Sequence, residues 1–150
     1  MLTVHVSKTG SVALAALIAG LCLGPAFSAA SRSAQDGVYS AEQAKRGQSV
    51  YREECAKCHA ENLTGGDGSP ELAGPEFRAR WTGKTVGQLF ELLRKTMPTD
   101  DPGHLAIRQY VDLTAYLLQA NEFPAGQKDL DRDIAAMNEI QIPAGAKPAK

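Results

Sequence analysis

The sequence predicts a small all-α domain. Two capping-box patterns, Ser40-Ala41-Glu42-Gln43 and Thr85-Val86-Gly87-Gln88, each introduce apolar residues at helical spacing. A third run, from about Leu105 to Ala120, carries a broad apolar stripe with the same period. No strand-like alternation precedes Cys55. These observations favour a few packed helices over a sheet.

Residues 1–30 have the pattern of a secretory signal peptide. Lys8 and His5 supply a basic start, Val12 to Leu23 form an apolar core, and small residues follow, with cleavage expected after Ser28 or Ala30. The apolar core is shorter than the ~20 residues of a membrane helix, so an uncleaved anchor is the weaker alternative. We therefore expect an exported, periplasmic protein without a membrane span in its mature form.

The mature chain would hold 120 residues, enough for one domain with a modest core. Only Lys8 among the charged residues lies in the first thirty, so the mature net charge is −2. This near-balance argues against nucleic-acid binding and gives no strong steering field. We expect a flexible arm over residues 31–39, the main domain over 40–121, and an extension over 122–150 with a short helix and a loose tail.

The first helix should start near Ala41 and carry Cys55 near its end. Ser40 and Gln43 are expected to complete its capping box. Gly47, Tyr51 and Cys55 recur every four residues and so share one face, where Gly47 permits a close helix crossing.

The motif Cys55-Ala56-Lys57-Cys58-His59 follows at the end of this helix. Two thiols three positions apart on a helical turn can reach both vinyl groups of a porphyrin, and the adjacent imidazole is a good iron ligand. The motif therefore predicts one covalently attached haem c, bound through Cys55 and Cys58 with His59 on the iron.

Other uses of two cysteines fit less well. A thioredoxin-like dithiol normally follows a strand in a βαβ unit. A structural zinc site needs a second ligand pair, and only His104 is left in the mature chain. A disulfide is geometrically possible but leaves His59 unexplained.

The remaining elements are a turn-rich loop and two helices. The loop spans 61–73 and shows no regular period. The second helix runs from Thr85 to a stop at Lys95 and Pro98, and the third ends near Asn121, a plausible C-terminal cap.

Met97 is the leading candidate for the sixth iron ligand. Its thioether would raise the reduction potential, and Pro98 would stiffen the loop that presents it. Met137 lies in an amphipathic segment that favours core packing, and His104 follows an exposed-looking turn. The alternative is that Met97 packs in the core at the end of the helix and does not bind the iron.

Together these residues resemble the class I cytochrome c family, over roughly Ser40 to Ala120. Gly47, Tyr51 and Cys55 match its Gly-xxx-aromatic-xxx-Cys helix, and Leu113 with Tyr116 resembles the face of the helix that crosses it. The resemblance implies a small cytochrome c fold of three to five helices around one haem, with the Pro70 carbonyl accepting the second imidazole proton of His59. Trp81 looks like a tryptophan that packs on haem and donates to a propionate, although a plain core role is open.

The resemblance implies an electron-transfer protein rather than an enzyme. The chain resembles small bacterial periplasmic monohaem c-type cytochromes, whose partners are dehydrogenases, oxidases or cytochrome complexes. Two alternatives stay open: a haem subunit fixed to a larger dehydrogenase, and a haem enzyme or gas sensor with an open iron site.

Overall fold

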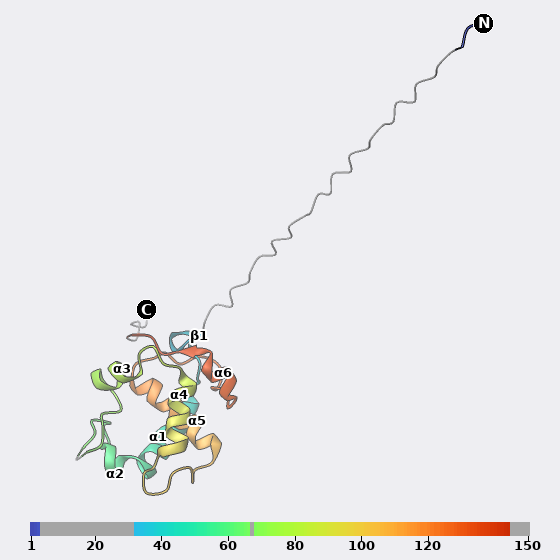
Figure 1. Cartoon of the computed structure of the whole chain (residues 1–150). Coiled ribbons are helices and arrows are strands. Elements are labelled where there is room, and N and C mark those ends of the chain that lie inside the picture. Colours follow the sequence, from blue (N-terminus) through green and yellow to red (C-terminus); the bar gives the residue numbers. More distant parts are fainter. Residues whose placement is uncertain (4–31, 67, 145–150) are drawn as a thin grey trace.

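The computed structural model describes residues 1–3, 32–66 and 68–144, and it is an all-α fold over this part of the chain (Figure 1). A short 3-10 turn η1 and a two-stranded parallel sheet complete the secondary structure. The elements are β1 (Arg32–Ser33), η1 (Ala34–Asp36), α1 (Ala41–Glu54), α2 (Ala56–His59), α3 (Pro75–Trp81), α4 (Val86–Thr96), α5 (Ile107–Ala120), α6 (Ile134–Asn138) and β2 (Ile140–Gln141).

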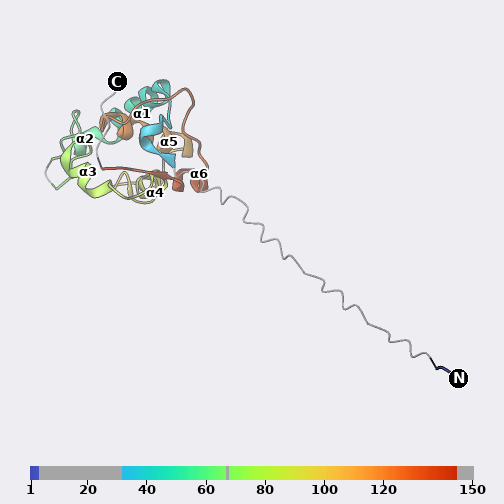
Figure 2. The ribbon, with the colours of Figure 1, turned by 90° about the horizontal axis from the view of Figure 1, so that it is seen from above.

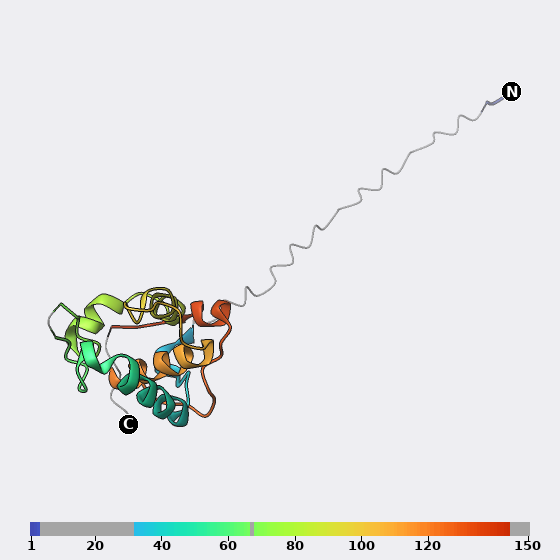
Figure 3. The same cartoon turned by 90° about the horizontal axis from the view of Figure 1, so that it is seen from below.

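Helices α1 and α5 cross in backbone contact at Gly47 (Figures 1 and 3). A Cβ atom on Gly47 would lie 1.9 Å from the carbonyl oxygen of Asp112 and 2.9 Å from Cβ of Tyr116. Next to this point the rings of Tyr51 and Tyr116 pack with their centroids 5.3 Å apart. The predicted close crossing on this face is confirmed.

The two predicted capping boxes differ in the structure. At α4 the box is complete: Thr85 Oγ1 accepts from the amide of Gln88, and Gln88 Oε1 accepts from the amide of Thr85. At α1 the Ser40 hydroxyl accepts from the amide of Gln43, but the Gln43 side chain does not reach back. It bonds both backbone groups of Leu130 instead, at 3.2 and 2.6 Å, so this half of the prediction was wrong.

Residues 32–39 are not the loose arm that the sequence predicts. Ala34, Val38 and Tyr39 are buried, and β1 pairs in parallel with β2. The Tyr39 hydroxyl donates to the carbonyl of Phe123, 84 residues along the chain. The segment is short and polar in sequence, but it pairs and hydrogen-bonds with the chain beyond α5, and the burial of its three apolar side chains stabilises it.

The segment after α5 returns across the fold and includes the expected short helix, α6, which packs against α4 (Figure 2). Ile142 and the 83–84 turn before α4 exchange backbone hydrogen bonds in both directions. The segment is therefore part of the packed fold at least as far as Ile142. The tail beyond residue 144 and, apart from residues 1–3, the expected signal peptide lie outside the described residues.

In the part of the chain that the structure describes, no helix has the length and apolar character needed to cross a membrane.

We predict that Gly47→Ala destabilises the protein by about 3 kcal/mol, because the new methyl group would overlap the α5 backbone. Urea denaturation measures the change. Ser49→Ala, on the exposed side of the same helix, is the control and should stay within about 0.5 kcal/mol of the wild type. Equal stability of Gly47→Ala and the wild type would contradict the close crossing.

Candidate functional site

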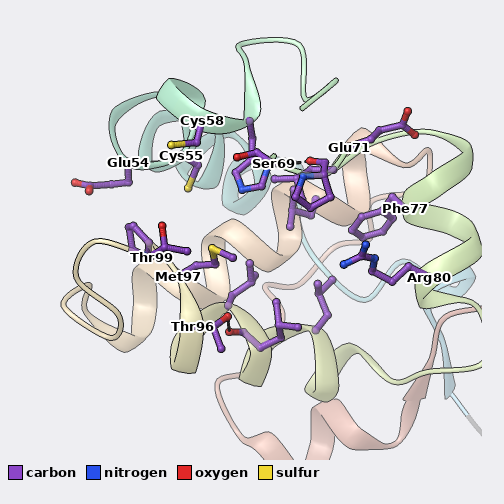
Figure 4. A pocket seen from close by; sticks show the side chains of 18 of the residues that line it. Glu54, Cys55, Cys58, Ser69, Glu71, Phe77, Arg80, Thr96, Met97 and Thr99 are labelled. Carbon is purple, nitrogen blue, oxygen red and sulfur yellow. Dashed lines mark hydrogen bonds between the residues drawn. The ribbon is translucent and has the colours of Figure 1, made fainter. Parts of the chain in front are cut away.

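A cavity of about 510 Å³ is lined by α2, the loop after it, α3, α4 and the segment after α4 (Figure 4). Much of its wall is apolar, formed by leucine and phenylalanine side chains of α3, α4 and α5. Figure 4 shows Cys55 and Cys58 on one side, Met97 across from them, and Phe77 and Arg80 farther along. All of the candidate site residues line this one cavity: Cys55, Cys58, His59, Pro70, Trp81 and Met97.

The two cysteines sit where α1 gives way to α2. Cys55 is the last, capping residue of α1, and its carbonyl accepts from the amides of Cys58 and His59. Both thiols are free. Burial raises the pKa of the Cys55 thiol to about 11, whereas Cys58 is exposed. The α2 turn thus places both sulfur atoms and the imidazole beside the same cavity.

The imidazole ring of His59 is held by a hydrogen bond to Pro70. Its Nδ1 lies 2.9 Å from the carbonyl oxygen of Pro70, and the residue is buried. A carbonyl oxygen only accepts, so Nδ1 carries a proton, and in the neutral ring Nε2 then keeps its lone pair. A neutral imidazole with this arrangement is a suitable metal ligand. Its backbone is also fixed, because the Tyr51 hydroxyl contacts the carbonyls of His59 and Ala60.

Asn121 hydrogen-bonds the loop that follows Pro70. The sequence predicted it only as a helix cap, and it is the cap residue of α5. Its fully buried side chain also accepts from the amide of Gly74 and donates to the carbonyl of Leu72, both at 3.0 Å. The signal available in the sequence was an asparagine directly after an amphipathic helix. Its burial and its loop partners could not be read from the sequence.

Met97 follows the last turn of α4, with its amide bonded to the carbonyl of Leu93. The alternative iron ligands lie elsewhere. Met137 is fully buried in α6 and lines a different cavity. His104 is in the 97–106 segment, where its Nε2 lies 3.3 Å from Glu54 Oε2. Neither lines the cavity that contains the two cysteines.

Trp81 is buried at the end of α3 and forms part of the cavity wall. Its ring packs against Phe77, with centroids 6.1 Å apart, and Lys84 Nζ lies 4.9 Å from its ring centroid. The expected contact of its indole N–H with a propionate stays a prediction. Arg80, one residue earlier, brings a cationic group to the same cavity.

Two ion pairs link the cysteine segment to the chain after Met97. Lys57 Nζ lies 2.5 Å from Asp100 Oδ2, and Glu54 pairs with His104. The hydrogen bond from Lys57 lowers the pKa of the Asp100 carboxyl. The hydrogen bond to the carbonyl of Asp101, together with the nearby Glu54 carboxylate, raises the pKa of His104.

The donor set suits haem c. It comprises two free thiols, an imidazole with a free lone pair and a thioether, around a mainly apolar cavity in the size range of cofactor sites. In the described part of the chain, no three His, Cys, Asp or Glu side chains gather as they would around a metal ion. Fold and site together define a c-type cytochrome domain, which implies haem c as the cofactor and electron transfer as the activity.

The comparison with known families gives the same class. The model of the family described as cytochrome c oxidase, cbb3-type, subunit III, matches residues 42–117, half of the chain. The chain belongs to this family of c-type cytochrome domains.

One solved structure is similar in fold, the sulfane dehydrogenase SoxCD from Paracoccus pantotrophus, with a TM-score of 0.49 and 19% sequence identity. The match covers 76% of this chain and 61% of that chain, so this chain spans less than two thirds of its length. No curated protein matches the chain.

We predict that His104 makes stability depend on pH, through its hydrogen bond to the Asp101 carbonyl and its contact with Glu54. Because the folded pKa of His104 is raised above its ordinary 6.5, its stabilisation is complete below that value and is lost as the pH rises through the folded pKa. The unfolding free energy of the wild type, measured in urea, should therefore fall relative to that of His104→Gln between about pH 5 and pH 8. Parallel pH profiles for the two proteins would disprove the link.

Proposed function

We propose that the protein is a periplasmic one-electron carrier with a single haem c, attached through Cys55 and Cys58 and ligated by His59 and Met97. The observation that carries the proposal is that all four side chains line one mainly apolar cavity. The bound haem would supply the chemistry, a cycle of its iron between the ferric and ferrous states.

The chain's own residues would hold and tune the cofactor. His59 would offer Nε2 to the iron, while its Nδ1–H bond to Pro70 fixes the ring and raises its basicity. Met97 would supply a soft donor that favours the reduced state. The apolar shell around them disfavours the extra positive charge of the oxidised state, which also raises the potential. With both axial positions filled, little substrate chemistry is expected at the metal.

The partners we propose are redox proteins that meet this domain weakly and through small interfaces. The family that the chain belongs to is described as an oxidase subunit. A haem subunit fixed to a larger enzyme is therefore the second candidate, and co-purification from the native membrane and soluble fractions would separate it from a free carrier.

Met97→Ala is the central test of the ligand assignment. It should lower the reduction potential by on the order of 100 mV, within the span of about 0.8 V over which axial ligands act. It should also let the reduced protein bind carbon monoxide rapidly, which the wild type should resist. Optical spectra and potentiometry measure both effects.

Met137→Leu is the matched control, because Met137 is a buried methionine away from the site. It should leave the spectrum and potential unchanged. An unchanged spectrum and potential in Met97→Ala would disprove the assignment, and rapid carbon monoxide binding by the wild type would favour an open-site haem enzyme or sensor.

Mass spectrometry tests export and attachment together. Produced from the full chain in a bacterium that matures haem c, the protein should lack residues 1–28 or 1–30 and carry the mass of one haem. The Cys55→Ala, Cys58→Ala double variant should lose the haem mass but keep the same N-terminus. A wild-type chain of full length would contradict the expected cleavage.

A further inference from the structure

The Tyr110 side chain makes two hydrogen bonds that close the loop after α4. Its ring is fully buried in α5, and its hydroxyl donates to the carbonyl of Met97 at 2.8 Å. The same oxygen accepts from the amide of Gly103 at 3.0 Å. One phenol group therefore ties together both ends of the loop 97–103.

Several buried neighbours of Tyr110 are apolar, although Asp112 and Thr114 of the same helix are buried as well. The neighbouring members of the α5 stripe, Val111 and Leu113, are buried hydrocarbon side chains. Tyr110 and Met97 also line a small apolar cavity together with Cys55. A phenylalanine would satisfy the packing at this position equally well, so the hydroxyl needs a reason of its own.

Because α5 packs directly on α1, the hydrogen bond from Tyr110 can fix the Met97 backbone relative to the cysteine segment. Helix α5 is in backbone contact with α1 at Gly47, and Cys55 is the cap residue directly after α1. A bond from α5 to the Met97 backbone therefore sets the methionine relative to the segment that holds the cysteines and His59. The Met97 amide also bonds the carbonyl of Leu93 in α4. The side-chain ties on and beside this loop, Lys57–Asp100 and Glu54–His104, are surface ion pairs, which hold a geometry weakly.

We infer that Tyr110 is a positioning residue for Met97: its hydroxyl keeps the loop 97–103 closed and the thioether on the iron. The inference rests on the proposed function, in which Met97 is an axial ligand. The residue acts through the backbone of Met97 and does not touch the iron.

Tyr110→Phe is the test, with Tyr116→Phe as the matched control. Tyr116 is a buried tyrosine of the same helix whose hydroxyl makes no hydrogen bond to any residue that the structure describes. In the reduced holoprotein, Tyr110→Phe should bind carbon monoxide roughly three- to tenfold faster than the wild type, the factor expected when the hydrogen bond to the Met97 carbonyl is lost. Its oxidised form should show a weaker methionine-to-iron charge-transfer band. Tyr116→Phe should match the wild type in both.

A purely structural role for Tyr110 would give a different result. If Tyr110→Phe lowered the unfolding free energy but left carbon monoxide binding and the charge-transfer band unchanged, the inference would be overturned. Amide hydrogen exchange of the wild type gives a check that needs no variant. The Gly103 amide should be protected, and exchange at the rate of a free loop would overturn the hydrogen bond itself.

Failure of the proposed function has its own signature. In that case the wild type would bind carbon monoxide rapidly, lack the charge-transfer band, and be unaffected by Met97→Ala. That result would overturn the inference together with the ligand assignment. Slow binding in the wild type, fast binding in Met97→Ala and no change in Tyr110→Phe would overturn the inference alone.

Discussion

The contact of α1 with α5 at Gly47 sets the frame on which the site depends. Helix α1 brings Cys55 to the cavity, while α5 carries the two buried polar side chains that hold the loops on either side of it. Tyr110 holds the loop after α4, and Asn121 holds the loop beyond Pro70. Because the two helix backbones touch at Gly47, a shift of one against the other would move both loops relative to the cysteines.

The features that the sequence predicted well depend on neighbours along the chain. Capping residues and apolar periodicity are local, and they gave the start of α1 at Ala41, the complete box at Thr85 and the stripe of α5. The candidate site could also be predicted, because Cys55, Cys58 and His59 lie within five consecutive residues. Met97 required a further argument, since its place in the same cavity depends on how α4 packs.

The features that sequence reasoning missed are contacts between distant segments. Gln43 has the spacing of a capping box, yet it bonds Leu130, 87 residues away, because the buried backbone there needs partners. Residues 32–39 look like a polar arm because the partners they contact, among them Phe123 and β2, lie far along the chain. No local pattern reports either partner, and the loop contacts of Tyr110 and Asn121 have the same origin.

Because of the segment after α5, the part of the chain that must be kept together on excision is longer than the part that matches the family. The family match ends at residue 117, but Arg46 lies between Asp112 of α5 and Asp129, and the buried amide of Gln43 is satisfied by Leu130. Excision at the matched ends would strip Gln43 of its partners and uncover the side chains beneath α6. A segment that keeps these contacts therefore runs from Arg32 to Ile142, and the β1–β2 pair brings its two ends together at one attachment point for grafting onto another scaffold.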